Sequence, residues 1–481
     1  MDTLSWIYIQ LEVVLLVTIW EILDRVEEGP ACKETDFDLN IFSATVNRLV
    51  SEHNLKCTPE EPIPNDNTLA DEVFEAGLEL ALEVGMLCTS TSRRIIFEED
   101  EIKEMLRGLP GEVVMGKEKD TRVMRWRTIS DSLPPLIQTG GLGQPTSEDI
   151  FLEEAVAFAQ DPLTDYFNQG SLTTVYGRAI KAGAPLEVEA GKYEIALVRE
   201  ALRRVGRPGL SILGTETSVT CLAEIAASST EGGLRRTDSH LVAIASDLKT
   251  DYQVLSKVVH LVGYDALICG LYTAIMGGYA GGPEGVAIAR VAGSILGQLV
   301  HRHSFAITGT PYNMRYVDIV PEISQLRKML WAHSIAMQAL SRNSKLLIGG
   351  TAGGAAGPCT EMLFWEMVPV TLMHTVSGCA FIESCFAAFN KYQDRPGVLE
   401  ARFTAELAHA ISKAQITREN ANDLVNSILN EKFSIYDGKT APEGKTFKEC
   451  FDTKTIKPNN EYYNLYKSVK MQAEDTLGIS I

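Results

Sequence analysis

The chain has 481 residues, of which 45% are hydrophobic and 22% are charged, and its formal net charge is -19. These proportions are typical of globular proteins and argue against disorder. The length allows several domains of average size or one barrel domain with long additions. The negative charge argues against nucleic acid and anionic membrane surfaces as partners. The nine cysteines include no C-x-x-C pair. This indicates free thiols in a reducing cytoplasm rather than a disulfide framework or a zinc ribbon.

Residues 1–130 are predicted to form a helical extension. Residues 6–20 are strongly apolar, but the first basic residue is Arg25, so neither a signal peptide nor a membrane span fits well. We expect a buried or interface helix that continues through residues 21–28. Residues 69–88 and 98–106 have apolar side chains at helical spacing or acids in a first turn, and each predicts a further helix.

Residues 131–440 contain short apolar runs that end in small or glycine-rich turns, with helical stretches between them. The runs are residues 136–139, 210–213, 305–308 and 346–348. Continuous apolar runs are typical of parallel strands covered on both faces. We therefore predict a (β/α)8 TIM-type barrel, with an open doubly wound sheet as the alternative. Residues 441–481 are polar with spaced aromatics, and we expect them to pack on the barrel or on a neighbouring subunit.

Polar residues near the predicted turns are candidates for chemistry, because barrel enzymes hold their active sites at the carboxyl ends of the strands. His240 could act as an acid or base, and Arg236 could hold a carboxylate, although a surface salt-bridge loop explains the same composition. Glu361 is equally explained as a helix N-terminal acid. The full set is Gln138, Glu216, Arg236, Asp238, His240, Glu284 and Glu361.

Two glycine-rich segments, residues 277–284 and 349–362, would let a ligand or another backbone approach closely. Neither has the register of a dinucleotide or P-loop motif, and each is also explained by a turn after a strand. His301 and His303 form an H-x-H pair without a convincingly spaced third ligand, so we expect no metal site. The residue patterns alone thus predict a barrel enzyme with an acidic, glycine-lined mouth, but they do not name the reaction.

Short motifs along nearly the whole chain point to one family. They are residues 22–32, 88–91, 138–149, 206–209, 214–218, 237–240, 277–282, 356–362 and 443–452. In this order and spacing, the chain resembles the monomethylamine methyltransferases of methanogens. The resemblance implies a (β/α) barrel that transfers a methyl group from methylamine to the Co(I) corrinoid of a separate corrinoid protein. It also implies no tightly bound cofactor, no zinc, and a homo-oligomer, with hexamers known in the family.

The chain departs from the family pattern at several positions of the implied pocket. Pyrrolysine, whose electrophilic imine is thought to capture the amine, corresponds here to Leu213, which can form no such adduct. A family acid corresponds to Leu271, and a Gln-Tyr-Tyr run begins here at Thr351. Two uncharged residues correspond to Arg235 and Arg236. The residues that match are Glu216, Asp238, His240 and Glu361.

These departures favour a different methyl donor. Co(I) is a strong nucleophile, so an activated donor such as a quaternary ammonium or a betaine needs no pyrrolysine. A cationic donor would gain from Tyr279 through a cation–π contact and, if it carries a carboxylate, from Arg236. On this hypothesis the catalytic residues are Leu213, Glu216 and Glu361, the substrate-binding residues are Gln138, Arg236, Asp238, His240, Leu271, Tyr279 and Thr351, and the corrinoid-facing residues are Gly277, Gly278, Gly353, Gly354 and Gly357. Two alternatives stay open: a non-catalytic paralogue that binds a corrinoid protein, and monomethylamine transfer through other residues.

Overall fold

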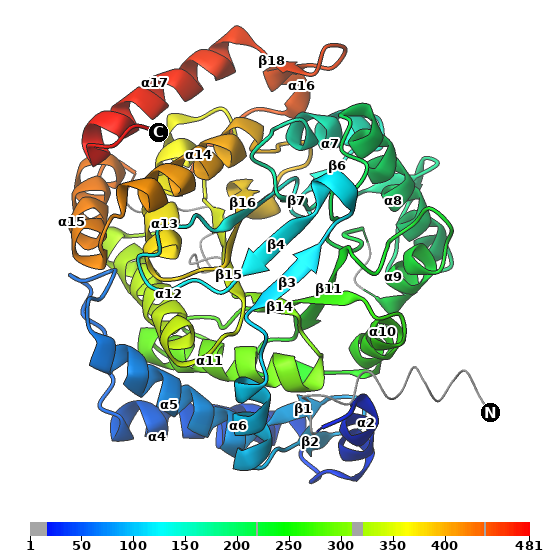
Figure 1. The fold of residues 1–481 in the computed structure, drawn as a ribbon, viewed down its shortest axis with the longest axis vertical. Helices are drawn as coiled ribbons and strands as arrows, with labels where there is room; N and C mark the ends of the chain where they lie inside the picture. Colours follow the sequence, from blue (N-terminus) through cyan, green and yellow to red (C-terminus); the bar gives the residue numbers. More distant parts are fainter. Residues whose placement is uncertain (1–16, 218–219, 310–320, 437–438) are drawn as a thin grey trace.

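A closed ring of parallel strands lies at the centre of the computed structural model, which describes residues 17–217, 220–309, 321–436 and 439–481 (Figure 1). The ring strands are β5 (Leu136–Thr139), β7 (Tyr166–Phe167), β11 (Ser239–Ile244), β13 (Leu267–Tyr272), β14 (Phe305–Ile307), β15 (Ile348–Gly353) and β16 (Phe381–Phe386). They pair in the order β11-β13-β14-β15-β16-β5-β7. Two isolated parallel bridges, Phe167 to Ile212 and Leu213 to Ser239, close the ring through an eighth, very short strand. The predicted (β/α)8 barrel is confirmed.

Two predicted strands differ in extent from those observed. Of residues 210–213, only Ile212 and Leu213 pair with neighbouring strands. The run predicted at residues 346–348 begins as β15 only at Ile348 and continues through the glycines that we expected to form a turn. A Cβ atom at Gly350 would overlap the ring of His374. Glycine therefore serves close packing between this strand and the helix that follows it.

A helix follows each ring strand and packs outside the ring (Figure 1). These helices are α7 (Phe151–Ala159), α8 (Leu186–Arg204), α9 (Cys221–Ser228), α10 (Tyr252–Gly263), α11 (Pro283–Val300), α12 (Ile323–Asn343), α13 (Glu361–Val376) and α14 (Val398–Ala414). The loops between these strands and helices also contain short elements, which are β6 (Pro145–Thr146), β8 (Ser171–Leu172), β9 (Thr174–Val175), β10 (Arg178–Ala179), β12 (Lys249–Thr250) and η4 (Ala387–Asn390). The alternation of strand and helix explains why the strands are apolar on both faces.

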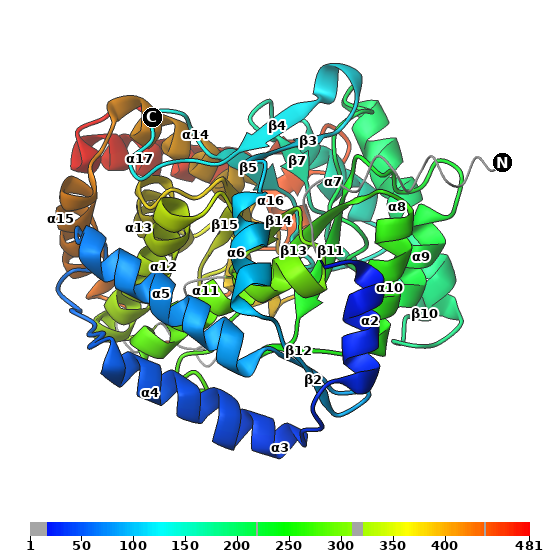
Figure 2. The ribbon, with the colours of Figure 1, turned by 60° about the horizontal axis from the view of Figure 1, so that its bottom comes forward.

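The N-terminal extension forms a layer beside α11 and α12 (Figure 2). Its elements are α2 (Ile19–Glu28), α3 (Glu34–Asp36), η1 (Phe37–Ser43), α4 (Ala44–Glu52), α5 (Asn67–Val84), β1 (Met86–Cys88), β2 (Arg93–Ile95) and α6 (Glu99–Arg107). Helix α5 lies against α11 so closely that a Cβ at Gly77 would overlap Val291. The layer therefore shares a hydrophobic core with the barrel.

The helices predicted in this extension are largely found. Helix α2 is capped by Thr18 and ends at Gly29, as expected, while residues 1–16 of the predicted N-terminal helix lie outside the described residues. Helix α6 matches the prediction at residues 98–106. The helix predicted for residues 69–88 extends too far at its carboxyl end. The observed helix α5 ends at Gly85, whose φ of +63° breaks the helix, and residues 86–88 form β1.

A hairpin of β3 (Glu112–Met115) and β4 (Arg122–Arg125), joined through η2 (Glu118–Asp120), closes the amino-terminal end of the ring. Met115 and Met124 pack against side chains from the ring interior. The hairpin backbone also donates from Gly116 to the carbonyl of Thr237, just before β11, at 2.8 Å. Figure 1 shows the hairpin lying across the strands. The hairpin therefore covers the amino-terminal end of the ring, and we call the end at the carboxyl termini of the strands the mouth.

The chain ends with α15 (Arg418–Ile428), η5 (Leu429–Phe433), α16 (Phe447–Cys450), β17 (Phe451–Asp452), β18 (Lys457–Pro458) and α17 (Asn460–Leu477). Helix α17 packs on α13 and α14 (Figure 1). Its Tyr462 is fully buried and accepts a hydrogen bond from the Leu399 backbone at 3.0 Å. In the described part of the chain, no helix is long and apolar enough to cross a membrane.

Candidate active site

Side chains that face the ring interior form two layers. The lower one, here called the apolar layer, comprises Tyr166, Leu213, Cys269, Phe305, Ile307 and Phe381. Rings of Tyr166, Phe305 and Phe381 meet edge to face, with centroids 5.4–6.2 Å apart. Closer to the mouth lies the polar layer, which comprises Gln138, Asn168, Thr351 and Glu383. The strand register places Thr351 beside Glu383 and Glu383 beside Gln138, so these three side chains face the same side.

Glu383 is the most constrained acid of the polar layer. Its carboxylate accepts from the Thr351 hydroxyl at 2.6 Å and from Asn168 Nδ2 at 3.1 Å, and the residue is only 7% exposed. Burial raises the pKa of Glu383, while the two hydrogen bonds act against that rise. The structure thus holds a carboxyl group in the barrel without a cationic partner among its described contacts.

Glu216 brings a second carboxyl to the same region, from the loop after the short strand at Leu213. Burial of the carboxyl raises the pKa of Glu216 well above its usual range, and the charges of Glu194 and Glu383 add to the rise. The ammonium group of Lys257 and the side chain of Asn168 act in the opposite direction. A Cβ at Gly143, which has a φ of +72°, would stand 2.8 Å from Glu216 Oε2. Glycine at this position therefore leaves room for the carboxyl.

Several amide atoms of the polar layer have no partner in the described structure. Gln138 is fully buried, yet neither its Oε1 nor its Nε2 makes a hydrogen bond, and Asn168 Oδ1 is also unpartnered. Buried polar atoms are nearly always satisfied, and leaving one unpaired costs about 1–3 kcal/mol. Acceptors beside two carboxyl groups are suited to a small polar or cationic ligand at this level of the barrel.

The two leucines singled out in the sequence are part of the barrel wall. Leu213 is fully buried within the apolar layer. Leu271 lies on β13, in register with Ala243 on one side and Ile307 on the other, and it packs against the apolar layer while remaining partly exposed. Both leucines therefore supply apolar surface next to the polar layer.

The expectation that Arg236 binds a substrate carboxylate is corrected by its position. Arg236 precedes β11, so it lies at the amino-terminal end of that strand, away from the mouth. Its side chain is 65% exposed and pairs with Asp265 at 3.1 Å. Its loop is thus the surface salt-bridge loop that its composition also allowed.

Asp238 and His240 are buried structural groups near the same end of β11. Asp238 forms an ion pair with Arg199 and accepts from the Ile212 backbone at 3.2 Å, which fixes the short strand. His240 pairs with Glu224 through Nδ1 and contacts the carbonyl of Arg235 through Nε2 at 3.0 Å. Neither belongs to the polar layer, so the prediction that they bind substrate directly is corrected.

Among the remaining predicted residues, Glu284 lies partly buried in the first turn of α11 and accepts from the Cys57 backbone at 2.8 Å. Gly277, Gly278 and Tyr279 are exposed in the loop after β13, on the mouth side. Glu361 is exposed at the first turn of α13, where its charge acts on Tyr436 rather than on the polar layer. The other glycines, Gly353, Gly354 and Gly357, are buried, and a Cβ at each would overlap atoms of Phe386, Glu366 and Glu443 respectively. Internal packing therefore accounts for these three.

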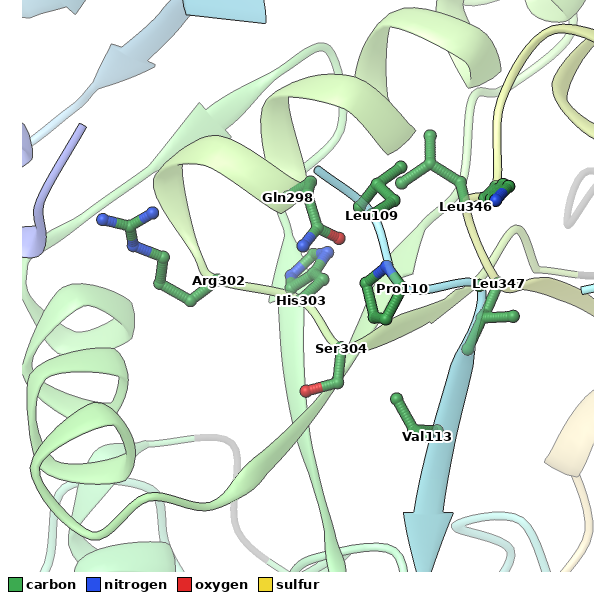
Figure 3. Close-up of a pocket in the computed structure, with 11 residues that line it drawn as sticks. Leu109, Pro110, Val113, Gln298, Arg302, His303, Ser304, Leu346 and Leu347 are labelled. Atoms are coloured by element: carbon green, nitrogen blue, oxygen red, sulfur yellow. The ribbon is translucent and has the colours of Figure 1, made fainter. Parts of the chain in front are cut away.

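A cavity of about 260 Å³ lies at the opposite end of the barrel, near the starts of β14 and β15 (Figure 3). Its walls include Leu109, Pro110 and Leu347. The Ser304 hydroxyl accepts from the Ile268 backbone at 3.1 Å, and Arg302 points away and donates to the carbonyl of Val17. The apolar layer separates this cavity from the polar layer, so it does not form part of the candidate site.

Five residues near the site are not among those predicted from the sequence. Asn168 and Gln169 follow a strand of only two residues, which no periodicity reveals. Glu383 interrupts the largely apolar run of residues 381–386, and the strand register of the barrel decides that its side chain faces the interior. Glu194 and Glu224 lie on helices α8 and α9 and are buried. An acid on the apolar face of a predicted helix is the signal that could have found these last two.

Comparison with known proteins gives a consistent result along the whole chain. The family model described as monomethylamine methyltransferase MtmB matches residues 17–478. MtmB1 of Methanosarcina barkeri and MtmB of Methanosarcina mazei are each 32% identical over 458 residues, covering 95% of this chain and 97% of the relative. The crystal structure of Methanosarcina barkeri MtmB has a TM-score of 0.90 at 31% identity and covers 96% of this chain and 98% of that one, and a hydroxylamine complex of MtmB matches equally. The chain therefore belongs to the monomethylamine methyltransferase MtmB family and is a methyltransferase.

Proposed function

We propose that the protein transfers a methyl group from a small quaternary ammonium donor to the Co(I) corrinoid of a separate corrinoid protein. The observation that carries the proposal is the polar layer. Glu216 and Glu383 act on each other electrostatically beside unpartnered amide atoms of Gln138 and Asn168, and the surrounding wall is apolar. Carboxylates in a site of low polarity favour a cation, and apolar walls favour its methyl groups.

The chemistry needs no acid or base from the protein. Co(I) supplies an electron pair to the methyl carbon as the carbon–nitrogen bond breaks, and the bonding pair stays on nitrogen. A quaternary donor then leaves as a neutral tertiary amine, so no proton moves. The task left to the chain is to hold the cation and align its methyl group, through positioning and electrostatics.

The side chains favour some donors over others. Leu213 offers no electrophile for amine capture, so a donor that is already activated fits better than monomethylamine. With Arg236 on the far end of the barrel, the polar layer itself contains no cationic side chain. A donor without a carboxylate, such as tetramethylammonium, is therefore favoured over a betaine.

We also infer how the partner meets the barrel. Gly277, Gly278 and Tyr279 are exposed on the mouth side, which supports a contact between this loop and a corrinoid or its carrier. Tyr279 is 41% exposed and offers an aromatic face to a flat ligand or to a cationic donor.

A donor panel tests the proposal. Methylation of cob(I)alamin is followed by absorbance with tetramethylammonium, betaine, trimethylamine and monomethylamine as donors. The proposal requires transfer from a quaternary donor and its loss in Glu216→Gln, with Glu419→Gln, an exposed acid on α15, as the matched control. Transfer from monomethylamine alone would contradict it. Binding to a corrinoid protein without transfer from any donor would favour the non-catalytic paralogue.

A further inference from the structure

The loop that carries Glu216, residues 214–217, is held by two buried glutamates from neighbouring helices. The backbone N–H groups of Glu216 and Thr217 donate to the two carboxyl oxygens of Glu194 on α8, at 2.7 and 3.0 Å. The backbone and hydroxyl of Thr215 donate to Glu224 Oε2 on α9, at 2.9 and 3.0 Å. The direction of the Glu216 side chain therefore depends on both carboxyl groups.

The Glu224 carboxylate, which holds Thr215, keeps its negative charge because His240 is its counter-ion. Nε2 of His240 lies 3.0 Å from the carbonyl oxygen of Arg235, which can only accept, so this nitrogen carries a proton. Nδ1 contacts Glu224. Burial opposes a charge on His240, but the Glu224 carboxylate outweighs it and raises the pKa of His240 above its ordinary value. Glu224 and His240 thus form a buried ion pair.

The Glu194 anchor has no such counter-ion within the described chain. It accepts from Gln169 Nε2 at 2.6 Å in addition to the two loop amides, and no Lys, Arg or His forms an ion pair with it among the described residues. Burial raises the pKa of Glu194 to about 7, although its hydrogen bonds favour the charged form. Unlike Glu224, this anchor therefore changes charge near neutral pH.

Titratable neighbours around Glu194 are mostly acidic. Glu216 on the loop is influenced by its charge, and Glu187 lies on the same helix, where it accepts from the Thr220 backbone at 3.3 Å. Titratable groups on the elements around the loop are Glu224 on α9, Glu154 on α7 beside Gly170, Glu383, whose charge acts on Glu216, and Lys257 on α10, whose positive charge acts on Glu216 and Glu224. An ionised Glu194 is thus opposed by its burial and by its repulsion with Glu216, and it is supported by the N–H donors of the loop and of Gln169.

We propose that Glu194 is a positioning residue for Glu216, and that the loop at residues 214–217 is ordered by the ionised form of Glu194 and loosened by its protonation. A protonated carboxyl replaces one acceptor oxygen by a hydroxyl donor, so it cannot keep all three hydrogen bonds at full strength. The importance of this device for activity rests on the proposed role of Glu216 in the active site, while the loop ordering itself does not.

Hydrogen exchange of the full-length protein tests the inference without any donor. Exchange of the amides of Glu216 and Thr217, which donate to Glu194, is measured between pH 6 and 8 and corrected for the intrinsic pH dependence of exchange. We expect the corrected protection of these amides to rise about tenfold from pH 6 to 8, which is the size expected for regaining a charge-assisted hydrogen bond. Glu194→Gln should remove this pH dependence, and Glu194→Asp should retain it at lower protection.

Glu366→Gln is the matched control. Glu366 is equally buried, burial raises its pKa to about 7, and it holds the backbone amides of Ala355 and Ala356 at 2.9 and 3.0 Å. This variant should alter exchange at those two amides and leave the 214–217 loop unchanged. Parent protection of the loop that does not vary between pH 6 and 8 would overturn the inference, even if a variant failed to fold. Failure of every methyl donor with intact pH-dependent protection would instead reject the proposed function.

Discussion

Replacing Glu383 with glutamine removes a charge from the polar layer and preserves its hydrogen bonds. The Thr351 hydroxyl, which donates at 2.6 Å, can donate equally to an amide oxygen. In the parent protein, Asn168 donates to Glu383 through Nδ2 at 3.1 Å, while Asn168 Oδ1 has no hydrogen-bond partner. Rotation of the Asn168 amide therefore lets Oδ1 accept from the NH2 group of the new glutamine. We therefore expect Glu383→Gln to fold normally and to differ from the parent mainly in charge.

The expected loss follows from Coulomb's law. A cation about 4 Å from a carboxylate gains about 4 kcal/mol at an effective dielectric constant of about 20. Loss of hydration by both groups reduces this gain, and we expect about 2–3 kcal/mol, or a 30- to 150-fold lower kcat/KM for a quaternary donor. Because the charge of Glu383 also raises the pKa of Glu216, the acid limb of the pH profile should move to lower pH in the variant.

The assay is methyl transfer to cob(I)alamin, measured as kcat/KM across pH, with thermal unfolding of each variant alongside. Glu419→Gln removes an exposed acid on α15 and should change neither property. A loss of less than about threefold in Glu383→Gln, together with an unmoved acid limb, would refute the electrostatic role assigned to the polar layer.

Three further predictions concern stability. Burial raises the pKa of Glu154 to about 8 from an ordinary 4.5. The contribution of Glu154 to the free energy of unfolding is therefore fully present below about pH 4.5, and about 5 kcal/mol is lost as the pH rises from there through 8. Glu154→Gln should therefore be more stable than the parent at pH 9 and similar at pH 4.5 in urea unfolding, and a difference independent of pH would contradict this. Leu213→Ala should lower the free energy of unfolding by about 2–5 kcal/mol, because it opens a void in the apolar layer, and a loss below about 1 kcal/mol would place Leu213 outside a packed core. Gly350→Ala should cost about 1–3 kcal/mol, because its methyl group overlaps His374, and unchanged denaturant midpoints would show that the helix can shift.

The barrel could be predicted because its signal is local and repeated. The run at residues 136–139 coincides with β5, and the run at residues 305–308 contains β14 and extends one residue beyond it, since buried parallel strands are apolar throughout. The sequence predicts a turn at the glycines of β15, but the observed requirement for glycine comes from residues later in the chain: Phe381 packs on Gly349, His374 on Gly350 and Phe386 on Gly353. Local composition contains no information about those contacts.

The site could be predicted only in part because it depends on direction as well as residue type. The sequence predicts Gln138, Glu216 and Thr351, and these residues lie in the polar layer or beside it. Arg236 was misplaced because a charged loop looks the same before a strand as after one, yet the two ends of a barrel strand are far apart. Glu383 was missed because its inward direction appears only once β15, β16 and β5 are aligned in register.

The source of the transferred methyl group is the most direct test of the central claim, that the polar layer selects a permanently cationic donor. The enzyme is given equal amounts of ¹³C-methyl tetramethylammonium and unlabelled monomethylamine, together with cob(I)alamin, and the methylcobalamin formed is analysed by ¹³C NMR. We predict that nearly all of the product carries the label, and that Glu383→Gln lowers the labelled fraction. Methylcobalamin formed mainly from the unlabelled monomethylamine would contradict the account.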